Sequence, residues 1–225
     1  MTDQTATGPG LTLYAYWRTS ATYRVRVALA LKGLTAQERL IDIDAGEHLR
    51  PEFLAINPQG ALPALVVHGH PPLTQSVAIL EFLDELYPQP ALLPDDPFGR
   101  ARVRSLAATM ASDTHPLIVP RVRKYLKEAA GFDDAAWRAW QTAWFTRGLT
   151  DIEARLRDDP ATGTFCHGGT PTMADICLAS VEAVARVFKI KVDGIPTVDR
   201  IVAACNALDA FSNADPMVQT GAPRA

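Results

Sequence analysis

Residues 14–32 read YAYWRTSATYRVRVALALK, and this stretch sets the beginning of the fold. An apolar strand over residues 11–16 runs into a turn, and a helix is predicted to follow it as far as residue 34 because apolar side chains recur there at helical spacing. The turn carries the hydroxyl side chains of Thr19, Ser20 and Thr22. Hydroxyls at a helix start can cap the helix, or they can bind an anion, since the free N–H groups and the helix dipole favour negative charge. This stretch alone leaves both uses open.

The remainder of the first 90 residues alternates strand and helix signals. Further strands are predicted over residues 40–43, 64–67 and 72–73. Ser76 is placed to cap a helix over residues 77–87, which carries an apolar stripe. A strand–helix–strand unit followed by two strands and a helix packs as one sheet covered by helices. The sequence therefore predicts an α/β N-terminal domain over residues 11–90.

A proline-rich segment separates this domain from the rest of the chain. Residues 88–98 hold four prolines, a composition that breaks a helix, and a linker is predicted over residues 91–98. Everything beyond it is predicted to be helical, over residues 100–128 with a bend near Pro116 and Pro120, 133–157, 172–189 and 198–211. The second domain is therefore expected to be all-α and to span residues 99–214.

Composition excludes several classes of protein. The 225 residues carry a net charge of −3 with acids and bases mixed, which argues against a nucleic-acid-binding protein. The three cysteines form no CxxC pair, so no disulfide framework or zinc site is expected, and a reducing cytoplasm is favoured. Residues 1–10 lack the apolar core of a signal peptide, and no stretch approaches the ~20 apolar residues of a membrane span. Residues 1–10 and the tail from about Ser212 are expected to be loose ends.

The segment NPQGALP over residues 57–63 has two readings. It is a plain loop, or it is a special turn in which Pro63 follows a cis peptide bond, an isomer found in about 5–6% of such bonds. A cis bond would expose the backbone N–H and C=O of Leu62 to an extended peptide ligand, as in strand addition. Gln75 and Ser76 are likewise either a helix cap or, together with the helix N-terminus, a site for a ligand carboxylate.

Each of the remaining polar candidates has either a structural or a functional interpretation. Residues 172–175 form a capping box before an apolar run, so Asp175 is interpreted as structural. His115 lies next to a predicted bend, where a structural or exposed role is usual. The histidines show no metal-ligand spacing, and no metal is predicted. Arg18 precedes the hydroxyl turn and is either a solvated charge or a bidentate partner for a carboxylate.

Taken together, these segments resemble a glutathione transferase, in which a thioredoxin-like N-terminal domain precedes an all-helical domain. The resemblance covers about residues 11–212. It rests on the turn over residues 57–63, on Gln75-Ser76 and on the capping box over residues 172–175. Residues 16–29, YWRTSATYRVRVAL, are similar to the opening motif of the zeta class, whose members include maleylacetoacetate and maleylpyruvate isomerases.

The resemblance assigns roles residue by residue. Thr19 stands where the family has its catalytic serine, and Ser20 matches the next serine. Glutathione would be bound by His48, Leu62, Gln75 and Ser76, and across a homodimer interface by His115 and Arg121. Arg18 matches an arginine that binds a substrate carboxylate. The motif's cysteine is replaced by Ala21, and Val187 stands where the isomerases carry a second arginine, although Arg186 is adjacent.

The resemblance implies a cytoplasmic, glutathione-dependent cis–trans isomerase of maleyl-type keto acids in aromatic or tyrosine catabolism. A hydroxyl donor would favour the glutathione thiolate, which adds to the cis double bond and permits rotation. The alternative is a transferase that conjugates or dehalogenates small electrophiles such as α-halo acids. A third possibility is a binding protein without turnover, against which the retained Thr19, Ser20, Gln75 and Ser76 argue.

Overall fold

The computed structural model describes residues 10–223, and most of the N-terminal segment predicted to be a loose end lies outside that range. The chain forms two compact units. The first holds the residues up to Pro90 together with those from Pro216, and the second holds Ala91–Asp215. The second unit thus begins at the first residue of the predicted linker, and residues 216–223 belong to the first unit.

The first unit is built on a mixed sheet with the strand order β2-β1-β3-β4. The strands are β1 (Leu11–Ala15), β2 (Gln37–Leu40), β3 (Ala64–Val67) and β4 (Leu73–Thr74). Strand β1 pairs in parallel with β2 and antiparallel with β3, and β3 pairs antiparallel with β4. The predicted α/β fold of the N-terminal domain is confirmed.

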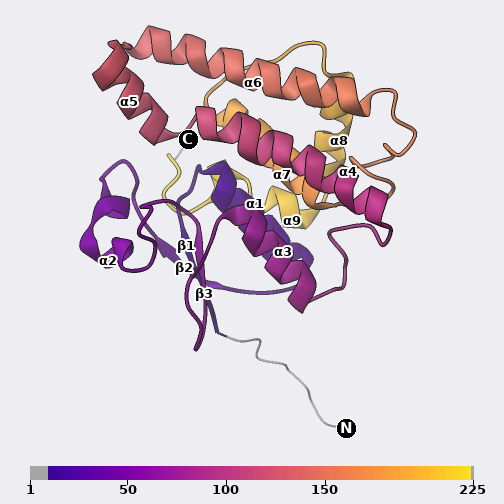
Figure 1. Ribbon diagram of the computed structural model, residues 1–225, viewed down its shortest axis with the longest axis horizontal. Helices are drawn as coiled ribbons and strands as arrows, with labels where there is room; N and C mark the ends of the chain where they lie inside the picture. The colour runs from indigo at the N-terminus through magenta and orange to yellow at the C-terminus, as the bar shows by residue number, and fades with distance from the viewer. Residues whose placement is uncertain (1–9, 224–225) are drawn as a thin grey trace. The chain divides into compact units, whose positions relative to one another are not determined.

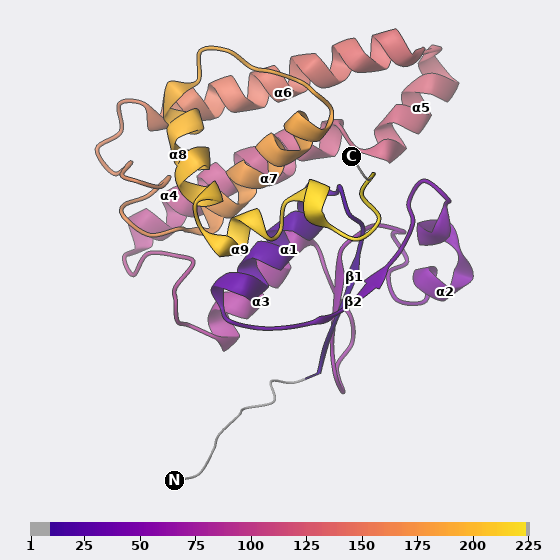
Figure 2. The same ribbon diagram turned by 180° about the vertical axis from the view of Figure 1, so that it is seen from behind.

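Helices cover both faces of this sheet. Helices α1 (Ser20–Leu31) and α3 (Ser76–Leu86) lie side by side on one face, and the short α2 (Pro51–Leu54) lies on the other, as Figures 1 and 2 show from opposite sides. The centre of this unit is fully buried and apolar, with Leu13, Val25, Leu65, Ile79, Leu80 and Leu83 all at 0% exposure. Burial of these side chains fixes α1 and α3 on the sheet, and with them the polar residues at the helix starts.

The second strand is the main error of the prediction in this unit. It lies at residues 37–40, three residues before the predicted start, and all of its side chains are exposed. The strand was predicted at residues 40–43 because apolar residues occur there, whereas the observed strand is a polar strand at the edge of the sheet. Arg26 of α1 forms a two-bond ion pair with Glu38, at 2.8 and 2.7 Å, which helps to select this register.

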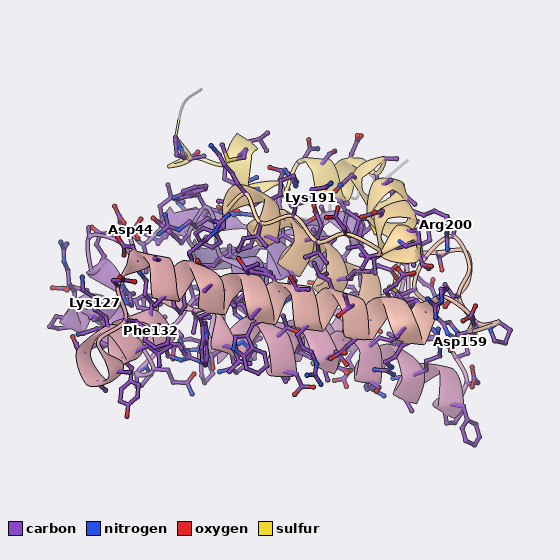
Figure 3. The ribbon with its side chains drawn as sticks, turned by 90° about the horizontal axis from the view of Figure 1, so that it is seen from above. Asp44, Lys127, Phe132, Asp159, Lys191 and Arg200 are labelled. Atoms are coloured by element: carbon purple, nitrogen blue, oxygen red, sulfur yellow. The ribbon has the colours of Figure 1, made fainter. Side chains whose placement is uncertain are left out.

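The second unit is helical, as predicted. Its helices are α4 (Pro97–Ala108), α5 (Pro120–Ala130), α6 (Asp134–Leu156), α7 (Met173–Val187), α8 (Pro196–Asn206) and α9 (Asp209–Ser212). Helix α7 packs against α4, α6 and α8, and most of its side chains are buried. Figure 3 shows α6 along its whole length, with Phe132 before its start and Asp159 beyond its end.

The sequence predicted one helix with a simple bend over residues 100–128, but the structure has two separate helices, α4 and α5, there. A π-helical turn (Thr109–Thr114) and a short 3₁₀ helix (His115–Leu117) separate the two helices. Gly148 of α6 lies against this turn, since a β-carbon there would come within 2.2 Å of the Thr114 hydroxyl oxygen. Such π-turns are frequent at functional sites, and this one sets the position of His115.

The C-terminal region also departs from the prediction. The helix predicted over residues 198–211 is divided into α8 and α9, because Leu208 adopts an extended backbone between them. The tail from Ser212 is not loose in its first part, since Ala214 and Pro216 are buried and a 3₁₀ helix follows at Pro216–Val218. No helix within the described chain combines the length and apolar character needed to cross a bilayer.

Candidate active site

The sheet register brings three predicted segments to one end of the first unit. In the antiparallel pairs, Tyr14 lies opposite Ala64, and Ala64 lies opposite Thr74. The residues that follow β1, those that precede β3 and those that follow β4 therefore meet at the same end of the sheet. These segments carry Arg18, Thr19, Ser20, Leu62, Gln75 and Ser76. Residues far apart in sequence thus form one candidate site.

Thr19 caps α1. Its hydroxyl oxygen accepts a hydrogen bond from the Thr22 N–H at 3.2 Å and lies 2.6 Å from the hydroxyl oxygen of Thr22. The capping role considered for this turn is therefore confirmed, and it does not prevent the second role. The bond between the two hydroxyls can be donated from either side, so the Thr19 proton can turn from Thr22 to an anion while Thr22 donates in its place.

Ser20 is the first residue of α1, and its hydroxyl is in a different environment. The residue is 1% exposed, and its hydroxyl oxygen has no hydrogen-bond partner among the described residues. A buried hydroxyl without a partner is costly, and a native structure needs a reason to retain one. The two neighbouring hydroxyls are therefore distinct: Thr19 has partners within the helix turn and Ser20 has none in residues 10–223.

The loop before β3 presents an open backbone. The Leu62–Pro63 peptide bond is cis, and neither the N–H nor the C=O of Leu62 has a hydrogen-bond partner among the described residues. Asn57 holds the loop from within, since its side-chain N–H donates to the Ala61 carbonyl at 2.6 Å. The special turn, and not the plain loop, is therefore the form that the structure adopts.

Gly60 brings His48 close to this loop. Its φ of +57° favours glycine, and a β-carbon there would lie 3.0 Å from the His48 carbonyl oxygen. The Nδ1 atom of His48 is buried and has no hydrogen-bond partner in the described part of the chain. Burial lowers the pKa of His48, while the charge of Asp44 raises it. The His48 backbone therefore lies beside the Leu62 loop, and its ring carries a buried nitrogen without a partner in residues 10–223.

The start of α3 corrects one prediction. Ser76 does not cap this helix with its side chain: it is the first helical residue, Gln75 is the N-cap, and the helix has no side-chain cap. The Ser76 hydroxyl oxygen instead accepts a hydrogen bond at 3.1 Å from Arg24, which is 1% exposed. Gln75 has a φ of +67°, which is uncommon for a residue other than glycine, and such residues cluster at active sites and ligand-binding turns. Its side-chain N–H donates to Gln59 at 2.9 Å.

Arg18 is held by residues that the sequence did not single out. It donates to Asp44 at 2.6 Å and lies over the rings of Tyr16 and Trp17 at 5.5 and 5.4 Å. The Tyr16 hydroxyl donates to the same carboxylate at 2.6 Å. Burial, aided by that hydrogen bond, raises the pKa of Tyr16 to about 12. Only one nitrogen of Arg18 is engaged within residues 10–223, so the others remain available to a ligand carboxylate.

The charge of Asp44 gives a testable pH effect at His48. A nearby carboxylate stabilises the protonated imidazole, so Asp44→Asn is expected to lower the pKa of His48 further below its usual value. NMR titration of the His48 ring proton measures this pKa directly. Glu85→Gln is the control, because Glu85 is at the other end of α3 from Ser76 and should leave the His48 titration unchanged. A His48 pKa that rises in Asp44→Asn would contradict the assignment.

Three predicted site residues lie in the second unit. His115 opens the 3₁₀ helix that follows the π-turn, and Arg121 lies in the first turn of α5, a helix with no buried residue. Arg186 lies in the last turn of α7, where it pairs with Asp215 at 2.6 Å and with Glu182 at 3.6 Å. Two carboxylates thus already bind Arg186. Within residues 10–223 no group of three or more His, Cys, Asp or Glu side chains is placed to hold a metal ion.

Sequence reasoning missed several residues of this site. Thr22 was noted as a hydroxyl, but its contact with Thr19 was not predicted. Arg24 and Asp44 were not singled out. A basic residue on the buried side of a helix was a usable signal for Arg24, because an arginine is rarely buried without a partner. The sequence contained no local signal for the contact between Arg18 and Asp44, which are 26 residues apart.

Comparison with known proteins places this geometry in a family. Residues 9–85 match the glutathione S-transferase N-terminal domain, and residues 132–212 match the glutathione S-transferase C-terminal domain. A maleylpyruvate isomerase of Ralstonia sp. is 42% identical over 92% of this chain and 97% of its own length.

Two solved structures are also similar. A maleylacetoacetate isomerase from Methylobacterium extorquens AM1, with bound malonate and GSH, has a TM-score of 0.93 and 46% identity, and the match covers 95% of this chain and all of that one. The holo structure of a maleyl pyruvate isomerase, a bacterial zeta-class glutathione S-transferase, has a TM-score of 0.90 and 41% identity, covering 94% of this chain and all of that one.

Proposed function

Because this chain belongs to the glutathione S-transferase family, we propose that it is a glutathione-dependent cis–trans isomerase of maleyl-type keto acids. The observation that carries the proposal is the open backbone of Leu62, which lies at the same end of the sheet as Thr19 and Ser76. The relatives named as maleyl isomerases, among them a structure with bound GSH and malonate, support both the cofactor and a dicarboxylate substrate.

The residues of the first unit fit glutathione. Leu62 offers one N–H and one C=O that have no partner in the described chain, which suits the backbone of a tripeptide. Ser76 keeps its hydroxyl proton for a ligand, since its oxygen already accepts from Arg24. That proton and the free N–H groups at the start of α3 are suited to the γ-glutamyl carboxylate, with Gln75 alongside, and His48 is proposed to contact the glycine end of glutathione.

Thr19 is proposed to donate its hydroxyl proton to the glutathione sulfur, with Ser20 as the neighbouring candidate. When bound, glutathione supplies a thiolate that adds reversibly to the cis double bond and so permits rotation about it. A free thiol has a pKa of about 8.5, so a shift of about two units needs ~2.7 kcal/mol. A hydroxyl donor and a helix N-terminus can together supply this amount. Arg18 is proposed to bind a substrate carboxylate with the nitrogens that Asp44 leaves available.

The second unit is proposed to complete the site in a homodimer. His115 and Arg121 would then reach glutathione bound to the partner subunit, and the exposure of Arg121 on α5 is compatible with this. Arg186 is a weaker candidate for substrate binding than Arg18, because Asp215 and Glu182 already neutralise it. The three cysteines are free and buried, which supports the proposed cytoplasmic location.

The proposal predicts catalytic isomerisation without net consumption of glutathione. With maleylacetone and a sub-stoichiometric amount of glutathione, the purified protein is expected to convert all of the substrate to the trans isomer, followed by its ultraviolet absorbance. An α-monohalo acid tests the transferase alternative, because displacement of its halide by the thiolate leaves a thioether and so consumes one glutathione per turnover. Conversion that stops when the glutathione is used, or that occurs only with the halo acid, would overturn the isomerase assignment.

Substitution of Ser76 tests whether this residue binds glutathione. Ser76→Ala removes a hydrogen bond to a charged group, worth about 1.5–3 kcal/mol, and is expected to weaken glutathione binding by about 10- to 100-fold in calorimetry. Ser212→Ala, on α9 of the second unit, is the matched control and should bind glutathione normally. Equal affinities of the two variants would contradict the assigned role of Ser76.

A further inference from the structure

Thr22 is a polar residue in an entirely buried position. It lies in the first turn of α1 and is 0% exposed. Its backbone N–H donates to the Thr19 hydroxyl oxygen at 3.2 Å, and its own hydroxyl oxygen is 2.6 Å from that same atom. The Thr22 hydroxyl has no other hydrogen-bond partner among the described residues. Two groups of one residue therefore converge on the hydroxyl of Thr19.

The hydrogen bond between the two hydroxyls has two possible directions. Each hydroxyl carries one proton, and the bond between them can be donated from either side. Without a ligand, Thr19 is able to donate to Thr22. When the Thr19 hydroxyl donates its proton to an anion outside the helix, the Thr22 hydroxyl becomes the donor to the Thr19 oxygen. The buried hydroxyl then has Thr19 as its acceptor, so no polar atom loses its partner.

We propose that Thr22 is a positioning residue that acts through Thr19: its hydroxyl and its N–H both donate to the Thr19 oxygen and so direct the Thr19 proton to the glutathione sulfur. The inference rests on the proposed function, because it assumes that Thr19 contacts the sulfur. Two donors to one oxygen make its remaining O–H more acidic and a stronger donor, since chains of hydrogen bonds polarise one another. Thr22 itself touches neither glutathione nor substrate.

The geometry distinguishes this role from ordinary packing. Valine has nearly the same shape as threonine but lacks the hydroxyl, so Thr22→Val keeps the volume and the backbone N–H and removes only one donor. Thr22→Ser keeps the hydroxyl and removes the methyl group. A packing role predicts that Thr22→Ser is the more damaging variant, because it leaves a small cavity. The proposed role predicts the reverse.

The test is the thiolate pKa of bound glutathione, measured by ultraviolet titration of the binary complex without substrate. One neutral hydrogen bond is worth about 0.5–1.5 kcal/mol, so Thr22→Val is expected to lower the acid dissociation constant of the bound thiol by about two- to tenfold, which raises this pKa and reduces the thiolate fraction at pH 7. Thr22→Ser should remain close to the wild type. The fall in kcat should match the fall in thiolate fraction, while KM for the keto acid stays unchanged.

Binding of S-methylglutathione separates this inference from the function on which it rests. That ligand has no ionisable thiol, so its affinity should be equal in the wild type, Thr22→Val and Thr22→Ser. Wild-type binding of S-methylglutathione together with an unshifted thiolate pKa in Thr22→Val would overturn the role of Thr22 and leave the proposed function intact. Failure of the wild type to bind either ligand would overturn the proposed function itself. Thermal unfolding checks that all three proteins are folded.

Discussion

Thr19→Val is expected to lower kcat/KM for glutathione-dependent turnover by about 10- to 100-fold. The variant removes a hydroxyl that would donate to a thiolate, and a hydrogen bond to a charged group contributes about 1.5–3 kcal/mol. It also removes the cap of α1, whose oxygen accepts from the Thr22 N–H, at a cost of about 1 kcal/mol in stability. Steady-state kinetics with varied glutathione measures the first effect, and thermal unfolding measures the second.

Two neighbouring variants serve as controls for this result. Thr19→Ser keeps both the hydroxyl and the cap, so it should retain most of the activity. Ser20→Ala removes a buried hydroxyl that has no partner in the described chain, and it should leave activity within about threefold and stability unchanged or slightly higher. A large loss in Ser20→Ala with full activity in Thr19→Val would transfer the sulfur contact to Ser20.

Asp175→Ala is expected to destabilise the second unit by about 3–5 kcal/mol. Asp175 is 0% exposed and accepts from the Cys166 N–H at 2.7 Å, the Thr172 N–H at 2.8 Å and the Thr172 hydroxyl at 2.7 Å. Removing the carboxylate leaves two backbone N–H groups buried without an acceptor, and each costs about 1–3 kcal/mol. Thermal unfolding is expected to shift down by about 10 °C.

Thr172→Val provides the comparison for that variant. It removes only the hydroxyl and keeps both N–H groups bonded to Asp175, so it should cost about 1 kcal/mol. Asp175→Asn keeps one acceptor oxygen and should fall between the two. Chemical denaturation of the three variants gives the ranking. If Asp175→Ala is no less stable than Thr172→Val, the carboxylate does not hold the loop that contains Cys166.

The contrast between Asp175 and Ser76 shows how far the sequence could predict such a structure. The capping box over residues 172–175 was predicted correctly because both of its hydrogen bonds join residues three positions apart. Ser76 was predicted as a cap by the same reasoning, but its oxygen accepts from Arg24. The local pattern is the same in both cases. A partner 52 residues away decides the second case, and no local pattern contains it.

The predicted bounds of two secondary-structure elements were also wrong because distant contacts, and not local patterns, decide them. Strand β2 was placed three residues too late because an exposed edge strand lacks the alternation of apolar and polar residues that identifies strands. Its register depends on pairing with β1 and on the contact between Arg26 and Glu38. The helix predicted over residues 198–211 is interrupted at Leu208, because the apolar spacing continues across a break in the backbone.

The sequence by itself determined the two-part architecture, the family and the residue types available for chemistry, because periodicity, proline content and short motifs are local properties. It also identified the turn that carries Thr19, Ser20 and Thr22. Only the tertiary structure decided which use each polar side chain has. Asp44 binds Arg18, Arg24 binds Ser76 and the hydroxyl of Thr22 faces that of Thr19. The physical reason is that a hydrogen bond depends on distance and direction in space, and the packing of α1 and α3 on the sheet sets both.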